Sequence, residues 1–283
     1  MESNLKSALV TGAGSGLGAA IARRLAHDGY RLVIVDTDTA TGQAQAKALP
    51  HAVAFATDVT DEAAVEAMLD ALGAIPDVLV NNAGIVRDRM FVNATEEEFD
   101  AVTAVHLKGH FATMKHAGAY WRAQSKAGNA VDARIINTSS GAGLQGSVGQ
   151  ATYSASKAGI AALTLVAAAE MGRIGVTVNA IAPSARTRMT ETVFAEMMST
   201  QDSAFDAMAP ENISPLVVWL GSVESRDVTG RIFEVEGGII RVAEGWARGG
   251  EIDKGAKWDP AELGPVVEDL LAKSRTPLPV FGA

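Results

Sequence analysis

The chain of 283 residues contains no cysteine. Without a thiol it can form no disulfide, thiolate zinc site, iron–sulfur cluster or cysteine nucleophile, so any redox chemistry requires a bound cofactor. The net charge is −9, and no stripe of lysines and arginines is interleaved with aromatic residues. This composition argues against nucleic acid as a partner.

Long apolar runs are also absent. The most apolar stretch, residues 158–169, is far shorter than the roughly 20 residues that a membrane span needs. Residues 1–6 lead directly into an apolar run and a glycine-rich turn, without the apolar core of a signal peptide. We therefore expect a cytoplasmic protein that does not associate with a membrane and holds no metal.

Short β-branched runs alternate with alanine-rich helical stretches along most of the chain. Continuously apolar strands that alternate with helices indicate βαβ units, and therefore a parallel sheet covered by helices on both faces. No linker-like segment interrupts this pattern before about residue 240. We predict one doubly wound α/β domain over residues 1–240, with a parallel seven-stranded sheet whose strands include residues 8–10, 32–35, 53–55, 78–80, 134–136, 176–178 and 232–235.

A glycine-rich segment, Thr11-Gly12-Ala13-Gly14-Ser15-Gly16-Leu17-Gly18, separates the first predicted strand from a helical run. Glycines permit a tight turn there and let backbone N–H groups and the helix N-terminus approach a pyrophosphate. Asp36 closes the second predicted strand, where its carboxylate can accept from both ribose hydroxyls and repel a 2′-phosphate. Together these features favour NAD over NADP, although a flexible turn and an ordinary strand-end acid are the simpler readings.

The spacing of these glycines resembles the T-G-x-x-x-G-x-G pattern of the short-chain dehydrogenase/reductase family. Further motifs follow in the family's order over residues from about 5 to 240: Asp58-Val59, Asn81-Asn82-Ala83-Gly84, Ser140 and Tyr153-Ser154-Ala155-Ser156-Lys157. The resemblance implies a Rossmann domain that binds a nicotinamide dinucleotide. With the glycine turn and Asp36, it gives as cofactor-binding candidates Gly12, Ser15, Gly16, Leu17, Gly18, Asp36, Asp58, Val59, Asn82, Ala83, Gly84, Tyr153, Lys157, Pro183 and Thr187.

Tyr153 and Lys157 are four residues apart on a predicted helix, so both side chains can reach one site. A tyrosine with the ordinary pKa of about 10 is a weak base near neutrality, but an adjacent ammonium and an oxidised nicotinamide would both favour its phenolate. The resemblance implies that Tyr153 exchanges the substrate hydroxyl proton while Ser140 hydrogen-bonds the reacting oxygen. Ser139 is the alternative to Ser140, and an incidental pair on a solvated helix face is the alternative to catalysis.

His106 stands where the family usually carries an asparagine that bends a helix and frees its backbone carbonyl to hold a water near the catalytic lysine. A backbone role survives substitution of the side chain. We therefore expect the His106 carbonyl to take part in a proton relay. Plain helix packing is the alternative, and an imidazole acting directly as the acid is the least favoured reading.

Two stretches, residues 81–89 and 182–191, resemble the (3R)-hydroxyacyl-CoA dehydrogenase domains of peroxisomal multifunctional enzymes, which also carry His at the position of His106. The resemblance implies an acyl-CoA substrate, specifically a 3-hydroxyacyl-CoA, oxidised between secondary alcohol and ketone with NAD. Pro183-Ser184 replaces the more usual Pro-Gly. Guanidinium groups suit phosphate, so candidates for contacting CoA are Arg87, Arg89, Arg186 and Arg188. For any one of them, a solvated surface residue or an ion-pair partner is the more common outcome.

Other functions stay open at this point. A 3-oxoacyl-thioester (acyl carrier protein) reductase and a hydroxysteroid dehydrogenase would use the same family core on a thioester or steroid substrate. A regulator that senses NAD without turnover belongs to a different class. The presence of Ser140, Tyr153 and Lys157 together argues against that regulator, because a sensor has no need for a proton donor.

Residues 241–283 form an extension beyond the family's common core, and they include Trp246, Trp258 and a helix start at Asp259-Pro260. Exposed tryptophans cost roughly 25 cal/mol per Å² of apolar surface, so we expect the extension to pack on its own domain or on a neighbouring subunit. It could close the substrate pocket or serve structure alone. The resemblance also implies a homodimer or homotetramer.

Overall fold

The computed structural model describes residues 5–187 and 205–282, and within them one sheet has eight strands in the order β3-β2-β1-β4-β5-β6-β7-β8. Neighbouring strands are parallel except β7 and β8, which are antiparallel. This arrangement confirms the predicted doubly wound α/β class. The strands are β1 (Ser7–Thr11), β2 (Arg31–Asp36), β3 (Ala52–Ala56), β4 (Val78–Asn81), β5 (Ala133–Thr138), β6 (Val176–Ser184), β7 (Ile232–Glu236) and β8 (Ile239–Ala243).

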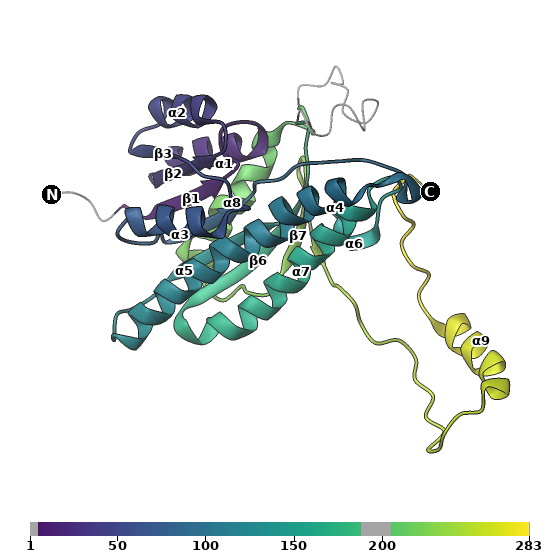
Figure 1. The fold of residues 1–283 in the computed structure, drawn as a ribbon. Coiled ribbons are helices and arrows are strands. Elements are labelled where there is room, and N and C mark those ends of the chain that lie inside the picture. Colours follow the sequence, from purple (N-terminus) through teal and green to yellow (C-terminus); the bar gives the residue numbers. More distant parts are fainter. Residues whose placement is uncertain (1–4, 188–204, 283) are drawn as a thin grey trace.

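Helices cover both faces of this sheet (Figure 1). Alternate residues of a strand point to opposite faces, and in β1 Ala8 and Val10 pack with α1 and α8, whereas Leu9 packs with α3, α5 and α7. The two apolar layers hold the strands in register. The helices are α1 (Gly16–His27), α2 (Thr39–Ala48), α3 (Glu62–Ala71), α4 (Glu96–Thr103), α5 (Gly109–Lys126), α6 (Gly141–Gln145), α7 (Ala151–Met171), α8 (Ser214–Gly221) and α9 (Leu263–Lys273), with a π-helical turn (Ala104–Lys108) between α4 and α5.

The prediction of seven strands is wrong by one. Gly237-Gly238, expected to follow the last strand, is instead the two-residue turn of a hairpin that leads into β8. Gly237 has φ +53°, which suits the turn type that joins antiparallel strands with a right-handed twist. The sheet therefore continues to Ala243, and residues 241–243 of the predicted extension belong to it.

The rest of the extension, residues 244–282, which we call the C-terminal arm, stands away from the sheet (Figure 1). Its helix α9 begins after a capping box formed by Asp259 and Glu262, which confirms the predicted helix start. Trp246 is 102% exposed in this single chain. Only the end of the arm returns to the domain, where Phe281 pairs with Ser147 in a short parallel bridge.

No helix in the described part of the chain is both long and apolar enough to cross a membrane.

Candidate active site

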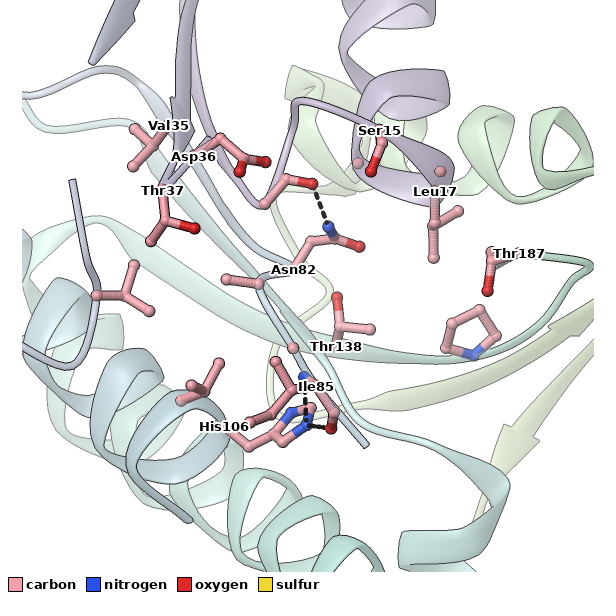
Figure 2. Close-up of a pocket in the computed structure, with 18 of the residues that line it drawn as sticks. Ser15, Leu17, Val35, Asp36, Thr37, Asn82, Ile85, His106, Thr138 and Thr187 are labelled. Atoms are coloured by element: carbon pink, nitrogen blue, oxygen red, sulfur yellow. Dashed lines mark hydrogen bonds between the residues drawn. The ribbon is translucent and has the colours of Figure 1, made fainter. Parts of the chain in front are cut away.

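A cavity of about 380 Å³ lies at the carboxyl ends of the parallel strands, near the point where the strand order reverses between β1 and β4. Such a reversal leaves a crevice between loops and is the common ligand position in α/β sheets. Figure 2 shows Asp36 and Thr37 on one side of this cavity and Thr187 on the other. Every residue predicted to contact a cofactor lines it, namely Gly12, Ser15, Gly16, Leu17, Gly18, Asp36, Asp58, Val59, Asn82, Ala83, Gly84, Tyr153, Lys157, Pro183 and Thr187.

The floor of the cavity is the turn between β1 and α1, which lies against the segment that follows β4. The Thr11 hydroxyl accepts hydrogen bonds from the backbone N–H groups of Asn82 and Ala83 at 3.0 and 3.1 Å. Gly12 has φ +63°, and a Cβ there would lie 2.8 Å from the Ala83 Cα. Only glycine permits this approach, so the two turns form one surface at the N-terminus of α1.

Asp36 closes β2 at the other side of the same turn. One of its carboxylate oxygens accepts from the Gly14 N–H at 2.8 Å, and the other accepts from the Asp38 N–H at 3.0 Å. These two bonds fix the carboxylate at the cavity wall. The only Lys or Arg side chain among the cavity-lining residues is that of Lys157, so the described wall around Asp36 offers no cation for an additional phosphate.

Tyr153 and Lys157 both extend from α7 into the cavity, as their spacing predicts. Lys157 is fully buried; its Nζ donates to the Thr138 carbonyl at 2.6 Å and lies 5.5 Å from the centre of the Tyr153 ring. The carbonyl at the end of β5 thus holds the ammonium beneath the tyrosine.

The structure distinguishes the two neighbouring serines after β5. The Ser139 hydroxyl is buried and donates to the Lys157 carbonyl at 2.9 Å, so it secures α7. Ser140 caps α6, accepts from the Ala142 N–H at 3.2 Å, and is hydrogen-bonded to the Tyr153 side chain. Ser140 therefore lies beside the tyrosine side chain, although Ser139 rather than Ser140 lines the cavity itself.

Burial shifts the pKa values of both groups on α7. It lowers the pKa of Lys157 to about 7 because desolvation disfavours the ammonium. Desolvation also raises the pKa of Tyr153, and its hydrogen bond to Ser140 opposes that rise only in part. The phenol of Tyr153 is therefore protonated near neutral pH.

His106 lies within the π-helical turn, buried, with its ring at the cavity wall (Figure 2). Its Nε2 is 2.7 Å from the Ile85 carbonyl, and its ring meets that of Tyr153 edge-on at 5.2 Å between centres. A Cβ on Gly84 would lie 2.5 Å from this ring. Burial lowers the pKa of His106 to about 3, so the imidazole is neutral near pH 7 and is unsuited to act as an acid.

The expected relay through the His106 carbonyl stays a prediction. The structure shows a second buried histidine next to the His106 backbone. His110, one turn later on α5, is buried and its ring is hydrogen-bonded to the backbone of His106. Its Nε2 also accepts weakly from the Thr138 N–H at 3.4 Å. The carbonyl of Thr138 also accepts from Lys157. His110 therefore connects the π-helical turn with the end of β5.

The sequence gives no signal for the contacts of His110, Thr138 and Ile85. The first two lie 28 residues apart on a helix and a strand, and no periodicity predicts that they meet. Ile85 acts through its backbone, which carries no signal in the residue type. The available clue was position alone: Thr138 ends a strand just before Ser140, and Ile85 follows the Asn82-Ala83-Gly84 motif.

The arginines proposed for CoA differ in their surroundings. Arg186 pairs with Asp206, and Arg89 pairs with Glu98 at 3.2 Å. Arg87 is exposed and donates to the Val86 carbonyl at 2.8 Å. Arg188 lies outside the described residues. Of the three described candidates, Arg87 is the one for which no carboxylate contact is observed.

Comparisons with known proteins show which sequences and folds this chain resembles. The sequence model of the short chain dehydrogenase family matches residues 6–198. Hydroxyacyl-CoA dehydrogenase ChsB1 of Mycobacterium tuberculosis is 43% identical over 98% of this chain and 92% of its own length, and the (3R)-3-hydroxyacyl-CoA dehydrogenase of Homo sapiens is 36% identical over 85% and 98%. The crystal structure of a short chain dehydrogenase from Mycobacterium avium, 62% identical, covers 98% of both chains with a TM-score of 0.89.

The neutral His106 makes a testable contribution to acid sensitivity. Its pKa is about 3 in the fold and about 6.5 in an unfolded chain. Below pH 6.5 the unfolded chain binds a proton that the folded chain does not, so this stability is complete above pH 6.5 and is lost as the pH falls toward 3. Between pH 6.5 and 5 we expect the loss from His106 to reach about 2 kcal/mol.

Urea denaturation at several pH values measures this loss. His106→Gln, which keeps a polar side chain but cannot titrate, should show a shallower decline of unfolding free energy than the unmodified protein. Equal slopes for the unmodified and His106→Gln proteins would contradict a buried, neutral imidazole.

Proposed function

The chain belongs to the short-chain dehydrogenase family and is an oxidoreductase, and we propose that it interconverts a 3-hydroxyacyl-CoA and the corresponding 3-ketone with NAD. The observation that carries this proposal is the position of the Tyr153 hydroxyl, bonded to Ser140, in a cavity whose far side is formed by Asp36. A group that can transfer a proton and the residues proposed to bind a dinucleotide therefore line one cavity.

The residues present fit a nicotinamide dinucleotide. A Cβ at Gly18 would lie 2.2 Å from the Gly12 carbonyl oxygen, so the glycines keep the turn close to the start of α1. Backbone N–H groups at a helix N-terminus suit a pyrophosphate. Gly12, Gly16 and Gly18 would hold that group, Asp36 the ribose, Asp58 and Val59 the adenine, and Pro183 and Thr187 the nicotinamide end. The bound cofactor supplies the acceptor or donor of hydride.

The chain's own groups handle the proton. Ser140 holds the substrate oxygen next to the Tyr153 hydroxyl, so that this hydroxyl can give a proton to a ketone or take one from an alcohol. The raised pKa of Tyr153 suits the donor, and the Lys157 ammonium 5.5 Å from the ring centre favours the phenolate that the reverse direction needs. With its pKa near 7, Lys157 can also exchange a proton at physiological pH.

NAD rather than NADP is supported by the fixed carboxylate of Asp36. Its two backbone hydrogen bonds hold the negative charge at the wall where the adenosine ribose would lie. Binding a 2′-phosphate there would bring two anions together in a partly buried place, where charge repulsion is weakly screened. The ribose hydroxyls of NAD, in contrast, can donate to this carboxylate.

The acyl-CoA substrate is supported by the relatives and by exposed apolar residues that follow β4. Two of the relatives are named hydroxyacyl-CoA dehydrogenases. The segment after β4 exposes Met90, Phe91 and Val92 at 56%, 79% and 87%, apolar surface suited to an acyl chain, and the exposed Arg87 is close in the chain. The substrate loop after Thr187 lies outside the described residues.

A turnover panel tests this function. We expect 3-hydroxyacyl-CoA thioesters with NAD to give kcat/KM at least about tenfold above hydroxysteroids, acyl carrier protein thioesters or small secondary alcohols. Steroids and small alcohols lack the phosphates of CoA, and a carrier-protein thioester has only a single phosphodiester in their place. Reduction of NAD is followed by absorbance. A higher kcat/KM with a steroid or a carrier-protein thioester would contradict the proposed 3-hydroxyacyl-CoA substrate. Binding of NAD without turnover of any substrate would identify the protein as a sensor.

Tyr153→Phe separates chemistry from binding. Removing the hydroxyl takes away the proton carrier while the ring remains against His106, so kcat should fall by at least about 100-fold. NADH affinity, measured by fluorescence titration, should change less than about threefold. A variant that keeps near-normal kcat would contradict the assigned role of Tyr153.

Asp36→Ala tests the cofactor preference. The unmodified protein should favour NAD, and the variant should narrow the ratio of kcat/KM for NAD over NADP by at least about tenfold, which corresponds to about 1.4 kcal/mol. Asp38→Ala is the matched control, because its carboxylate caps α2 and does not line the cavity. Equal use of both cofactors by the unmodified protein would remove Asp36 from the account of specificity.

A further inference from the structure

The segment that follows β4 is attached to the start of α7 by its backbone. The Arg89 N–H donates to the Gly149 carbonyl at 2.8 Å, and Arg89 forms a short parallel bridge with Gln150. Gln150 directly precedes α7, and its carbonyl accepts from the Ser154 N–H at 2.8 Å in the first turn of that helix. The segment is therefore attached to the same helical turn that carries Tyr153.

Two side chains reinforce this backbone contact. The Gln150 side-chain amide donates to both carboxylate oxygens of Asp88, at 3.1 and 3.2 Å. Hydrogen bonds to an ionised acceptor are stronger than bonds between neutral groups, and more so where water is excluded. Gln150 is only 7% exposed, so loss of Asp88 would leave a buried amide without this acceptor. The position of Gln150 therefore depends on Asp88.

The other end of the segment is attached beside the Tyr153 ring. The His106 Nε2 lies 2.7 Å from the Ile85 carbonyl, and the His106 ring meets the Tyr153 ring edge-on at 5.2 Å between centres. Residues 85–89 are thus held at one end by the residue that contacts the tyrosine ring and at the other end by the turn from which the tyrosine extends. Asp88 makes the second of these attachments through its side chain.

The charge of Asp88 is not neutralised by the arginines on either side of it. Arg89 pairs with Glu98 at 3.2 Å, and Arg87 donates to a backbone carbonyl at 2.8 Å. Among the contacts of the described residues, the Asp88 carboxylate is bonded to the neutral Gln150 amide and to neither guanidinium. Asp88 therefore presents a negative charge beside the first turn of α7.

Four elements contribute polar or titratable side chains to the surroundings of Tyr153. Lys157 of α7 lies 5.5 Å from the ring centre, Ser140 after β5 is bonded to the tyrosine side chain, and the His106 ring of the π-helical turn is neutral near pH 7. Desolvation is the largest cause of the raised pKa of Tyr153, and the negative charge of Asp88 adds to this rise. Asp88, on the segment after β4, therefore opposes formation of the phenolate.

We propose that Asp88 is a positioning residue for Tyr153 in the alcohol–ketone reaction. Through Gln150 its carboxylate fixes the first turn of α7, and its charge keeps the Tyr153 hydroxyl protonated and able to donate to a ketone. Neither Asp88 nor Gln150 lines the cavity, so both act through the tyrosine rather than on the cofactor. This role rests on the proposed function, because it requires that Tyr153 exchange a proton with the substrate.

Asp88→Asn separates the charge from the contact, because the amide oxygen of asparagine can still accept from Gln150. Alcohol oxidation needs the phenolate, so its kcat/KM rises with pH through the pKa of Tyr153. Without the negative charge that pKa falls, and the midpoint of the pH profile should move to lower pH, while kcat at the plateau should change less than about threefold.

Asp100→Asn is the matched control, because it makes the same substitution at an exposed position of α4. Its midpoint should coincide with that of the unmodified protein. A midpoint for Asp88→Asn that is unchanged, or that moves to higher pH, would overturn the proposal.

A double-mutant cycle tests the contact with Gln150. Asp88→Ala and Gln150→Ala should each lower kcat at least about fivefold and change NADH affinity less than about twofold, because neither residue lines the cavity. Both variants remove the same contact, so the double variant should be little worse than either single one. Two effects that simply multiply in the double variant would contradict the pairing.

Hydrogen exchange of the free protein, followed by mass spectrometry, examines the same contact without substrate or cofactor. Asp88→Ala should speed exchange in the peptides that contain the Arg89 and Ser154 N–H groups, because these donate to Gly149 and Gln150. Asp100→Ala should leave both peptides unchanged. Equal exchange in Asp88→Ala and the unmodified protein would show that Asp88 does not hold this turn and would overturn the proposal.

Failure of the proposed function would look different. In that case the unmodified protein would oxidise no secondary alcohol, or Tyr153→Phe would keep its kcat. If instead the unmodified protein is active and Tyr153→Phe is not, but the Asp88 variants behave like the Asp100 variants, the role of Asp88 alone is wrong.

Discussion

The hydrogen bond between the buried Lys157 ammonium and the Thr138 carbonyl determines the geometry of the site. A buried ammonium is costly without partners, and this contact ties α7 to the end of β5. The neighbouring Ser139 hydroxyl makes a second tie, to the Lys157 carbonyl. Because both bonds join the same strand end to the same turn of α7, the position of Tyr153 follows from them, and so does its contact with Ser140.

The cavity side of this arrangement depends on a different constraint, the close approach of two turns. Gly12 has no room for a Cβ against Ala83, and Gly84 has none against the His106 ring. The segment after β4 is therefore approached closely from two directions, by the glycine turn at Ala83 and by the His106 ring at Gly84. The imidazole takes the space over Gly84, contacts the Ile85 carbonyl and meets the Tyr153 ring edge-on, so this histidine shapes the site through its side chain.

The sequence predicts those features that depend on residues close together in the chain. The glycine turn, the acid ending β2 and the spacing of Tyr153 and Lys157 each indicate a local geometry, and the fold brings all of them to one cavity. Strand β8 was missed because Gly237-Gly238 suits a chain end as well as a hairpin turn. The pairing of His110 with Thr138 was missed because it depends on how α5 lies against β5, which no local pattern specifies.

The C-terminal arm shows a further limit on inference from one chain. Its tryptophans predict burial, yet in a single subunit Trp246 is fully exposed and only Phe281 is anchored. The arm's own domain therefore does not supply the burial that Trp246 predicts. The end of the arm does reach the active site, because Phe281 bridges to Ser147 in the segment between Ser140 and Tyr153. This contact lies at the catalytic end of the cavity, apart from the glycine turn and Asp36, so the two parts of the site have different supports.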